Sequence, residues 1–147
     1  MIDAKAFVSQ LHTLGGGIYN AASMALRSAV QAAEADAKGT TLYNNRTGLL
    51  RSKTTGSVNG LSGEIRAATP YAKWVENGTR PHKITARKGG VLCFVSGGAT
   101  RFARSVNHPG TAERPFMQHA KDVGDKTLDY GADYFLDYAT NAFNRMT

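Results

Sequence analysis

The C-terminal part of the sequence carries its strongest structural pattern, a series of apolar or small side chains spaced by three or four residues. The repeating positions are Phe116, Ala120, Val123, Thr127, Tyr130, Tyr134 and Tyr138. This spacing predicts one face of a helix that begins just after Pro115, ends near Phe143 and is about 40 Å long. A helix of this length needs another part of the chain to cover its apolar face.

Two more helices are predicted in the N-terminal part of the sequence. Apolar residues recur at helical spacing over Phe7–Leu14 and again, with many alanines, over Ile18–Lys38. The run Gly15–Gly17 separates the two stretches, and three consecutive glycines make a helix interior costly. We therefore expect an N-terminal helix pair over residues 1–38, with an alanine face that can approach a neighbour closely.

Short strands are predicted in the middle of the sequence. Residues 57–69 are typical of two strands around a turn at Asn59-Gly60 and Ser62-Gly63, and residues 84–95 of a hairpin with Lys88-Gly89-Gly90 at its tip. The sequence also predicts a short helix over Tyr71–Asn77 and a long loop, with room for one strand, over residues 96–115. The resulting fold class is α+β, a single domain of residues 1–147 in which a mainly antiparallel sheet is packed by the helix pair and the long final helix. Its parts are the helical N-terminus (1–38), the sheet and loops with an extended hairpin (39–114) and the C-terminal helix (115–147).

Charge is distributed unevenly along the sequence, whose formal net charge is +7. Residues 39–114 hold twelve lysines and arginines against three glutamates, whereas residues 115–147 hold five aspartates against three cations. Such a basic middle can bind nucleic acid, and it can equally bind the acidic end of another copy of the chain.

Three sets of charged side chains are candidate binding residues. An acidic stripe on the final helix and a basic set in the middle are candidates for a subunit interface: Asp122, Asp125, Asp129, Asp133 and Asp137, with Arg51, Lys53, Arg66, Arg80, Arg101 and Arg104. Lys83, Arg87 and Lys88, near the tip of the predicted hairpin, are candidates for an assembly loop or a DNA-facing surface. A solvated helix face is the simpler explanation of the acidic stripe, and both explanations stay open.

The sequence carries no strong catalytic or metal-binding motif. The glycine triplet lacks the strand that precedes a phosphate-binding loop, and the histidines form no HExxH pattern. Glu76 as a general base and a zinc site from Cys93, His82 and His108 are weak candidates, because an ion pair and a buried strand cysteine are simpler explanations. We predict no catalytic residue, metal or cofactor, and no enzyme activity. The sequence also lacks a signal peptide and an apolar run of about 20 residues, so we expect a protein made in the cytoplasm without membrane contact.

Four short phrases carry a family resemblance: TGLLRS at 47–52, YAKWVENGT at 71–79, NHPGT at 107–111 and RPFM at 114–117. In this order they resemble the head–tail joining or tail-completion family of phages, the gene-product-ten-like family of lambdoid and related long-tailed phages, over about residues 5–125. The resemblance implies a structural virion protein of the phage neck that completes the tail end and joins head to tail as a ring of identical copies, expected to be a hexamer.

The resemblance also implies partners, a location and structural residues. The partners would be a neck protein on the head side, a tail-tube or tail-terminator protein on the tail side, and passing genomic DNA. The location would be the head–tail junction of the virion, after assembly in the bacterial host cytoplasm. The structural residues would be Gly48, Tyr71, Glu76, Gly78, Thr79, His108, Pro109, Gly110, Pro115 and Phe116, with Trp74 packing the short helix on the sheet.

The alternative function is that of a small basic nucleic-acid-binding protein. Its support is the cluster of cations between residues 80 and 104, interleaved with Phe94 and Phe102. Cations of this kind grip a phosphate backbone and aromatic rings stack on bases, although both phenylalanines are equally expected in a strand core.

Overall fold

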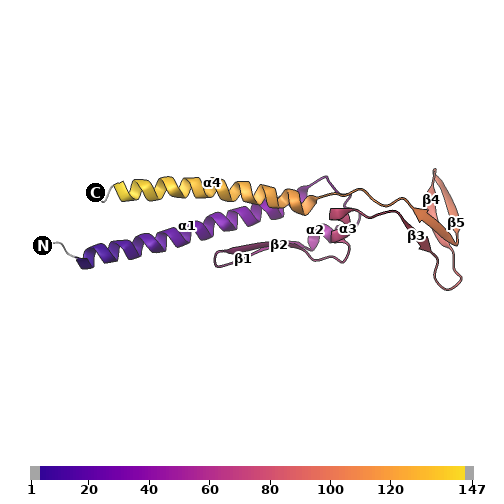
Figure 1. Cartoon of the computed structure of the whole chain (residues 1–147), viewed down its shortest axis with the longest axis horizontal. Coiled ribbons are helices and arrows are strands. Elements are labelled where there is room, and N and C mark those ends of the chain that lie inside the picture. The colour runs from indigo at the N-terminus through magenta and orange to yellow at the C-terminus, as the bar shows by residue number, and fades with distance from the viewer. Residues whose placement is uncertain (1–3, 145–147) are drawn as a thin grey trace. The chain divides into compact units, whose positions relative to one another are not determined.

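The computed structural model describes residues 4–144, which form helices and antiparallel strand pairs (Figure 1). The elements are α1 (Ala4–Gly39), α2 (Leu49–Ser52), β1 (Thr54–Asn59), β2 (Ser62–Ala67), α3 (Ala72–Asn77), β3 (His82–Thr85), β4 (Leu92–Ser96), β5 (Ala99–Ala103), β6 (Ser105–His108) and α4 (Phe116–Asn144). The α+β class and the long C-terminal helix are confirmed. The chain divides into two compact units, of which unit 2 is Lys73–Pro115 and unit 1 is the rest of the chain. That the whole chain is a single domain stays a prediction.

Unit 1 is built on α1 and α4, which run antiparallel and side by side (Figure 1). Its core contains Ala29, Ala33 and Ala37 of α1 together with Phe116 and Ala120 of α4, all of them buried. Small residues allow the helices to approach closely. A Cβ atom added at Gly124 would lie 3.1 Å from the Cβ of Ala33, and one added at Gly131 would lie 2.9 Å from the Cβ of Ala25.

The predicted break of the N-terminal helix is wrong, because α1 runs unbroken from Ala4 to Gly39. Each interior glycine costs about 1 kcal/mol relative to alanine, a penalty that tertiary packing routinely overrides. Here α4 lies alongside α1 at the glycine run: Leu14 before the glycines and Ile18 after them line a groove together with Phe135 of α4. The helix pair expected over residues 1–38 is therefore one helix.

The predicted buried face of α4 is right in its first half and wrong in its second. Phe116 and Ala120 are fully buried, but Tyr130, Tyr134 and Tyr138 are 80%, 74% and 62% exposed. The side that packs on α1 continues instead through Gly124, Leu128, Gly131 and Phe135, each at least half-buried. The glycines permit the close approach to α1, and the three tyrosine side chains stay largely exposed to solvent.

The β1–β2 hairpin is confirmed, and it packs on α1. Asn59 pairs with Ser62 across a two-residue turn in which Gly60 has a φ of 59°. A Cβ atom at Gly56 would lie 2.5 Å from Val30 Cγ1, so the strand touches the helix at this glycine. The Gly56 amide donates a hydrogen bond of 2.9 Å to Glu34 Oε2, which joins the hairpin to the helix.

Glu34 is expected to make this contact sensitive to acid. Hydrogen bonds from Lys38 and from the Gly56 amide lower the pKa of the Glu34 carboxyl. Because its folded pKa is depressed, the stabilisation is present above the ordinary glutamate pKa and is lost as the pH falls through the lowered value. Glu34→Gln should cost about 1 kcal/mol at neutral pH and less in acid, as measured by urea unfolding at several pH values.

Glu64→Gln is the matched control for this substitution. It changes an exposed glutamate of β2 and keeps both hydrogen bonds of Glu34. An equal loss of stability in the two variants at neutral pH would contradict the role given to Glu34.

Strand pairing in unit 2 differs from the predicted hairpin at residues 84–95. β3 pairs with β6, and β4 pairs with β5, both antiparallel. The tight turn lies at Gly97 and Gly98, whose φ values of 62° and 76° suit a two-residue hairpin turn. The predicted long loop at 96–115 therefore contains β5 and β6. Instead of one sheet, the described residues form three separate two-stranded pairs.

Candidate nucleic-acid interface

Two of the sequence phrases meet in unit 2, where Thr79 and Thr111 form an antiparallel bridge. The Thr79 amide donates to the Thr111 carbonyl at 3.0 Å, and the Thr111 amide donates to the Thr79 carbonyl at 3.1 Å. The two hydroxyl oxygens also lie 3.1 Å apart. The bridge therefore ties the segment after α3 to the segment after β6.

Two glycines, each directly before a bridge threonine, face the backbone of the opposite segment. Gly78 has a φ of +66°, and a Cβ atom there would lie 2.4 Å from the Thr111 carbonyl oxygen. Gly110 has a φ of +87°, and its Cβ would lie 2.2 Å from the Thr79 carbonyl oxygen. Because both the left-handed backbone and the close approach exclude a side chain, only glycine fits at either position.

Two histidines lie opposite each other in the β3–β6 pair. The rings of His82 and His108 stack with their centroids 5.1 Å apart and an angle of 28° between planes. His82 Nδ1 lies 2.9 Å from the Arg80 carbonyl oxygen, which can only accept, so this nitrogen donates. The Gly110 amide donates to His108 Nδ1 at 3.0 Å. Both rings are thus held in fixed orientations beside the bridge.

A hollow of about 530 Å³ lies next to this pair, lined by Trp74, Gly78, Thr79, Arg80 and His82. The Trp74 side chain was expected to pack on the sheet, yet it is 51% exposed. The Lys73 ammonium lies 5.3 Å from the centroid of the indole ring, within reach of a cation–π contact. The hollow therefore combines an aromatic surface with an arginine, a hydroxyl and an imidazole.

Unit 2 carries most of the net positive charge of the chain. Its eight lysines and arginines against two glutamates give it +6 of the formal net charge of +7. The predicted cations in this unit all have exposed side chains: Arg80, Lys83, Arg87, Lys88, Arg101 and Arg104. Phe102 of β5 is exposed among them, whereas Phe94 is half-buried.

The remaining predicted cations and the acidic stripe lie in unit 1. Arg51, Lys53 and Arg66 are exposed on and beside α2 and β2. All five aspartates of the stripe are exposed on α4. Asp122 accepts a hydrogen bond from Gln118, and Asp125 pairs with Lys121 and raises the pKa of that ammonium. The role of these residues in an interface stays a prediction.

The other motif residues have local structural roles. Gly48 has a φ of 74° just before α2, and Pro115 immediately precedes α4. Phe116 is fully buried and contacts the edge of Tyr43 with ring centroids 4.9 Å apart. Tyr71 is half-buried, and Pro109 is exposed just before Gly110. The Glu76 carbonyl accepts a hydrogen bond from the Arg114 amide.

No metal centre is assembled by the residues that the structure describes, since no three His, Cys, Asp or Glu side chains come together in a suitable group. Cys93 was expected to be buried, but it is exposed on β4, because the two-stranded β4–β5 pair leaves alternate side chains in contact with solvent. Nor is any helix within residues 4–144 both long and apolar enough to cross a membrane.

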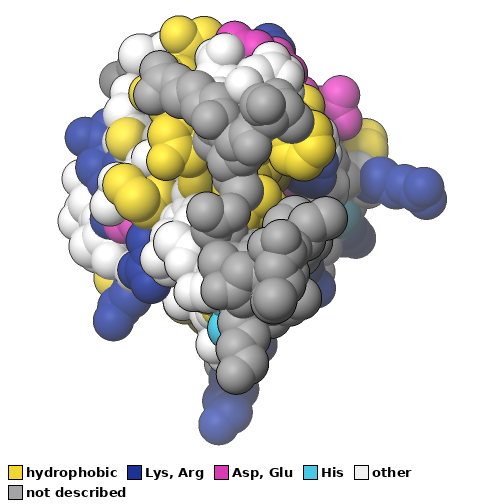
Figure 2. All heavy atoms as spheres, turned by 90° about the vertical axis from the view of Figure 1, so that its left-hand side faces the viewer, with side chains coloured by type: hydrophobic (Ala, Val, Ile, Leu, Met, Phe, Trp, Pro, Cys, Tyr) yellow, Lys and Arg dark blue, Asp and Glu magenta, His cyan; other side chains and the backbone are white. Residues whose placement is uncertain are grey.

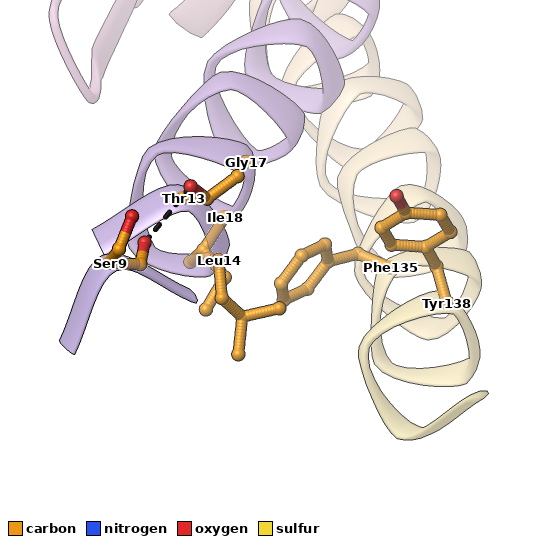
Figure 3. Close-up of a pocket in the computed structure, with 7 residues that line it drawn as sticks. All are labelled: Ser9, Thr13, Leu14, Gly17, Ile18, Phe135 and Tyr138. Carbon is orange, nitrogen blue, oxygen red and sulfur yellow. Dashed lines mark hydrogen bonds between the residues drawn. The ribbon is translucent and has the colours of Figure 1, made fainter. Parts of the chain in front are cut away.

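A second hollow lies in unit 1 between the ends of α1 and α4. It has a volume of about 320 Å³ and is lined by Leu14 and Ile18 of α1 and by Phe135 and Tyr138 of α4, with Ser9, Thr13 and Gly17 at its side (Figure 3). Figure 2 shows hydrophobic side chains gathered at this end of unit 1. Among the residues that the structure describes, no charged side chain lines this hollow, whereas Arg80 lines the hollow in unit 2.

Sequence reasoning missed the hollow in unit 2 as a site. Arg80 was predicted as a cation of a subunit interface or of the nucleic-acid-binding cluster, and Trp74 only as a packing residue. The available signal was Trp74 itself, a large aromatic residue in a short polar helix between Lys73 and Glu76. All five residues that line the hollow lie between positions 74 and 82, so this signal was local in the sequence.

Comparison with known proteins finds relatives among ribosomal proteins. The sequence is 34% identical over 119 residues to the large ribosomal subunit proteins uL10 of Stutzerimonas stutzeri and Pseudomonas aeruginosa, and 33% identical to that of Ectopseudomonas mendocina. The match covers 81% of this chain but only 57% of the length of these relatives. No family model matches the sequence. No solved structure matches it either.

These relatives correct the phage interpretation of the sequence. The similarity to ribosomal proteins extends over 81% of the chain, whereas the phage resemblance is carried by four short phrases. Residues of those phrases have local structural roles in this chain: Gly78 and Gly110 allow the Thr79–Thr111 bridge to form, and Pro115 precedes α4. The head–tail joining function, the ring of identical copies, the neck and tail partners and the virion location are therefore wrong. The prediction that the chain is not an enzyme is confirmed by relatives named as proteins of a ribosomal subunit.

Proposed function

We propose that this chain is a non-catalytic RNA-binding protein that associates with the large ribosomal subunit through the basic surface of unit 2. The observation that carries the proposal is the concentration of +6 of the net charge of +7 within Lys73–Pro115. This is the nucleic-acid-binding alternative of the sequence analysis, with RNA as the nucleic acid.

The chemistry of unit 2 suits contact with phosphate. Five of its eight cations are arginines, whose planar guanidinium groups donate paired hydrogen bonds to phosphate oxygens. The short β3–β6 and β4–β5 pairs carry Lys83 and Arg101 with their side chains exposed, and Arg87 and Lys88 lie in the segment between β3 and β4. Each cation that neutralises a phosphate releases condensed counterions, and this release drives binding.

The relatives support RNA over DNA. They are named as proteins of the large ribosomal subunit, a particle of RNA and protein. Because the match covers 57% of their length, association with that particle is part of the proposal.

Affinity for RNA that falls steeply with salt is the expected result. Fluorescence anisotropy with a labelled RNA hairpin should give a linear loss of log affinity with log salt concentration, with a slope of about −0.7 to −0.9 for each phosphate contacted. The protein should also sediment with purified large ribosomal subunits at low salt. The matched control is a DNA hairpin of the same sequence, which should bind more weakly.

Three outcomes would overturn the proposal. They are RNA affinity that does not respond to salt, failure to sediment with large subunits, and equal affinity for the DNA hairpin.

A further inference from the structure

We infer that the hollow beside Trp74 in unit 2 is a binding site for one unpaired nucleotide of RNA. This inference rests on the proposed function and deepens it, because it names the structural feature of the RNA that unit 2 prefers. Its ligand is a base that has left its stack, at a bulge, a loop or a single-stranded end.

The indole of Trp74 provides the stacking surface. Half of the side chain is exposed, although indole is among the largest apolar groups that a protein can bury. The ring lines a hollow of about 530 Å³, within the range of about 300 to 1,000 Å³ that is common for small-ligand sites. A base inside a duplex has both faces covered by its neighbours, so only an unpaired base offers a free face to the indole.

Polar groups around the hollow match the rest of a nucleotide. Arg80 lines the hollow with an exposed guanidinium that can reach a phosphate or the acceptor edge of a base. His82 also lines it, and because its Nδ1 donates to the Arg80 carbonyl, its Nε2 is left for the ligand. Lys73, at the Trp74 ring, adds a second positive charge for the phosphate.

The hollow is held in shape before any ligand arrives. Two of its lining residues, Gly78 and Thr79, are held by the Thr79–Thr111 bridge through hydrogen bonds of 3.0 and 3.1 Å and by close backbone contacts at Gly78 and Gly110. The stack of His82 on His108 holds the imidazole at its edge. A site that is already ordered loses little conformational entropy on binding.

Trp74 is the only tryptophan in the chain, so its fluorescence reports on this site alone. The experiment uses the full chain and two RNA hairpins that differ by a single bulged adenosine. Stacking of the adenine on the indole should quench the tryptophan signal, and the bulged hairpin should bind about tenfold more tightly than the paired one. Trp74→Ala should abolish that preference while salt-dependent binding of the paired hairpin remains, and Trp74→Phe should restore part of it.

Phe102→Ala is the matched control, because Phe102 is an exposed aromatic residue of the same unit that does not line the hollow. It should leave the ratio of the two affinities unchanged. Salt-dependent binding of both hairpins without quenching, or an unchanged preference in Trp74→Ala, would overturn the nucleotide site and leave the proposed function standing. Binding to neither hairpin would overturn both.

Discussion

Replacement of Gly110 with alanine is expected to destabilise unit 2 by about 3 to 4 kcal/mol, a large effect for a single added methyl group. The new Cβ would lie 2.2 Å from the Thr79 carbonyl oxygen and 3.0 Å from the Arg80 carbonyl carbon, both of which are backbone atoms. The φ of +87° adds the strain of a left-handed backbone. The Thr79–Thr111 bridge would have to open to relieve both. Hydrogen exchange should then become roughly a hundredfold faster for the amides of Lys73–Pro115 and should stay unchanged in α1.

Gly89→Ala is the control that separates the close contact from the backbone strain. Gly89 has a similar φ of +73°, but a Cβ atom there would meet nothing within 4 Å. Its substitution should cost only about 1 kcal/mol, since it introduces the strain alone. If the two variants exchange at the same rate, the contact between Gly110 and Thr79 does not hold unit 2 together.

The sequence was sufficient for the elements whose signals are local and repeated. The helix at residues 116–144 could be predicted because its apolar positions recur over many turns. The β1–β2 hairpin could be predicted because Gly60 suits a tight turn. After Thr127 the predicted buried face of α4 was wrong. Tyrosines at 130, 134 and 138 continue the apolar spacing, but Gly131 and Phe135 form the side that packs on α1. Composition cannot say which of two adjacent helix faces packs, because the shape of the partner decides it.

The strand pairing of unit 2 could not be predicted from local sequence patterns. The prediction that residues 84–95 form a hairpin follows from the glycines at 89 and 90, yet β3 pairs with β6, about 20 residues further along the chain. Gly78 and Gly110 were each singled out by their phrases, but no pattern in either phrase says that each lies against the backbone of the other segment. The residues that line the hollow beside Trp74 all lie between positions 74 and 82, but the sequence indicated only a basic and aromatic region, because a hollow is a feature of the folded surface.

The charge of unit 2 leads to the second large expected effect. Lys83→Gln, Arg87→Gln and Lys88→Asn together remove three exposed cations from one segment. Asparagine is chosen at position 88 because it tolerates the φ of 49° that Lys88 adopts. If each cation contacts one phosphate, the salt slope should fall by about two to three and RNA affinity at low salt by about a hundredfold.

The decisive comparison is with the same loss of charge in unit 1. Arg51→Gln, Lys53→Gln and Arg66→Gln also remove three exposed cations and lower the formal net charge from +7 to +4. Long-range attraction between protein and RNA depends on net charge and is screened beyond about 8 Å at physiological salt, so this variant should bind more slowly at low salt only. Direct phosphate contacts release condensed counterions, so their number sets the slope of log affinity against log salt concentration. Anisotropy titrations at several salt concentrations should therefore leave the slope of the unit 1 variant close to wild type and flatten that of the unit 2 variant. Equal slopes in the two variants would mean that net charge, and not the surface of unit 2, attracts the RNA.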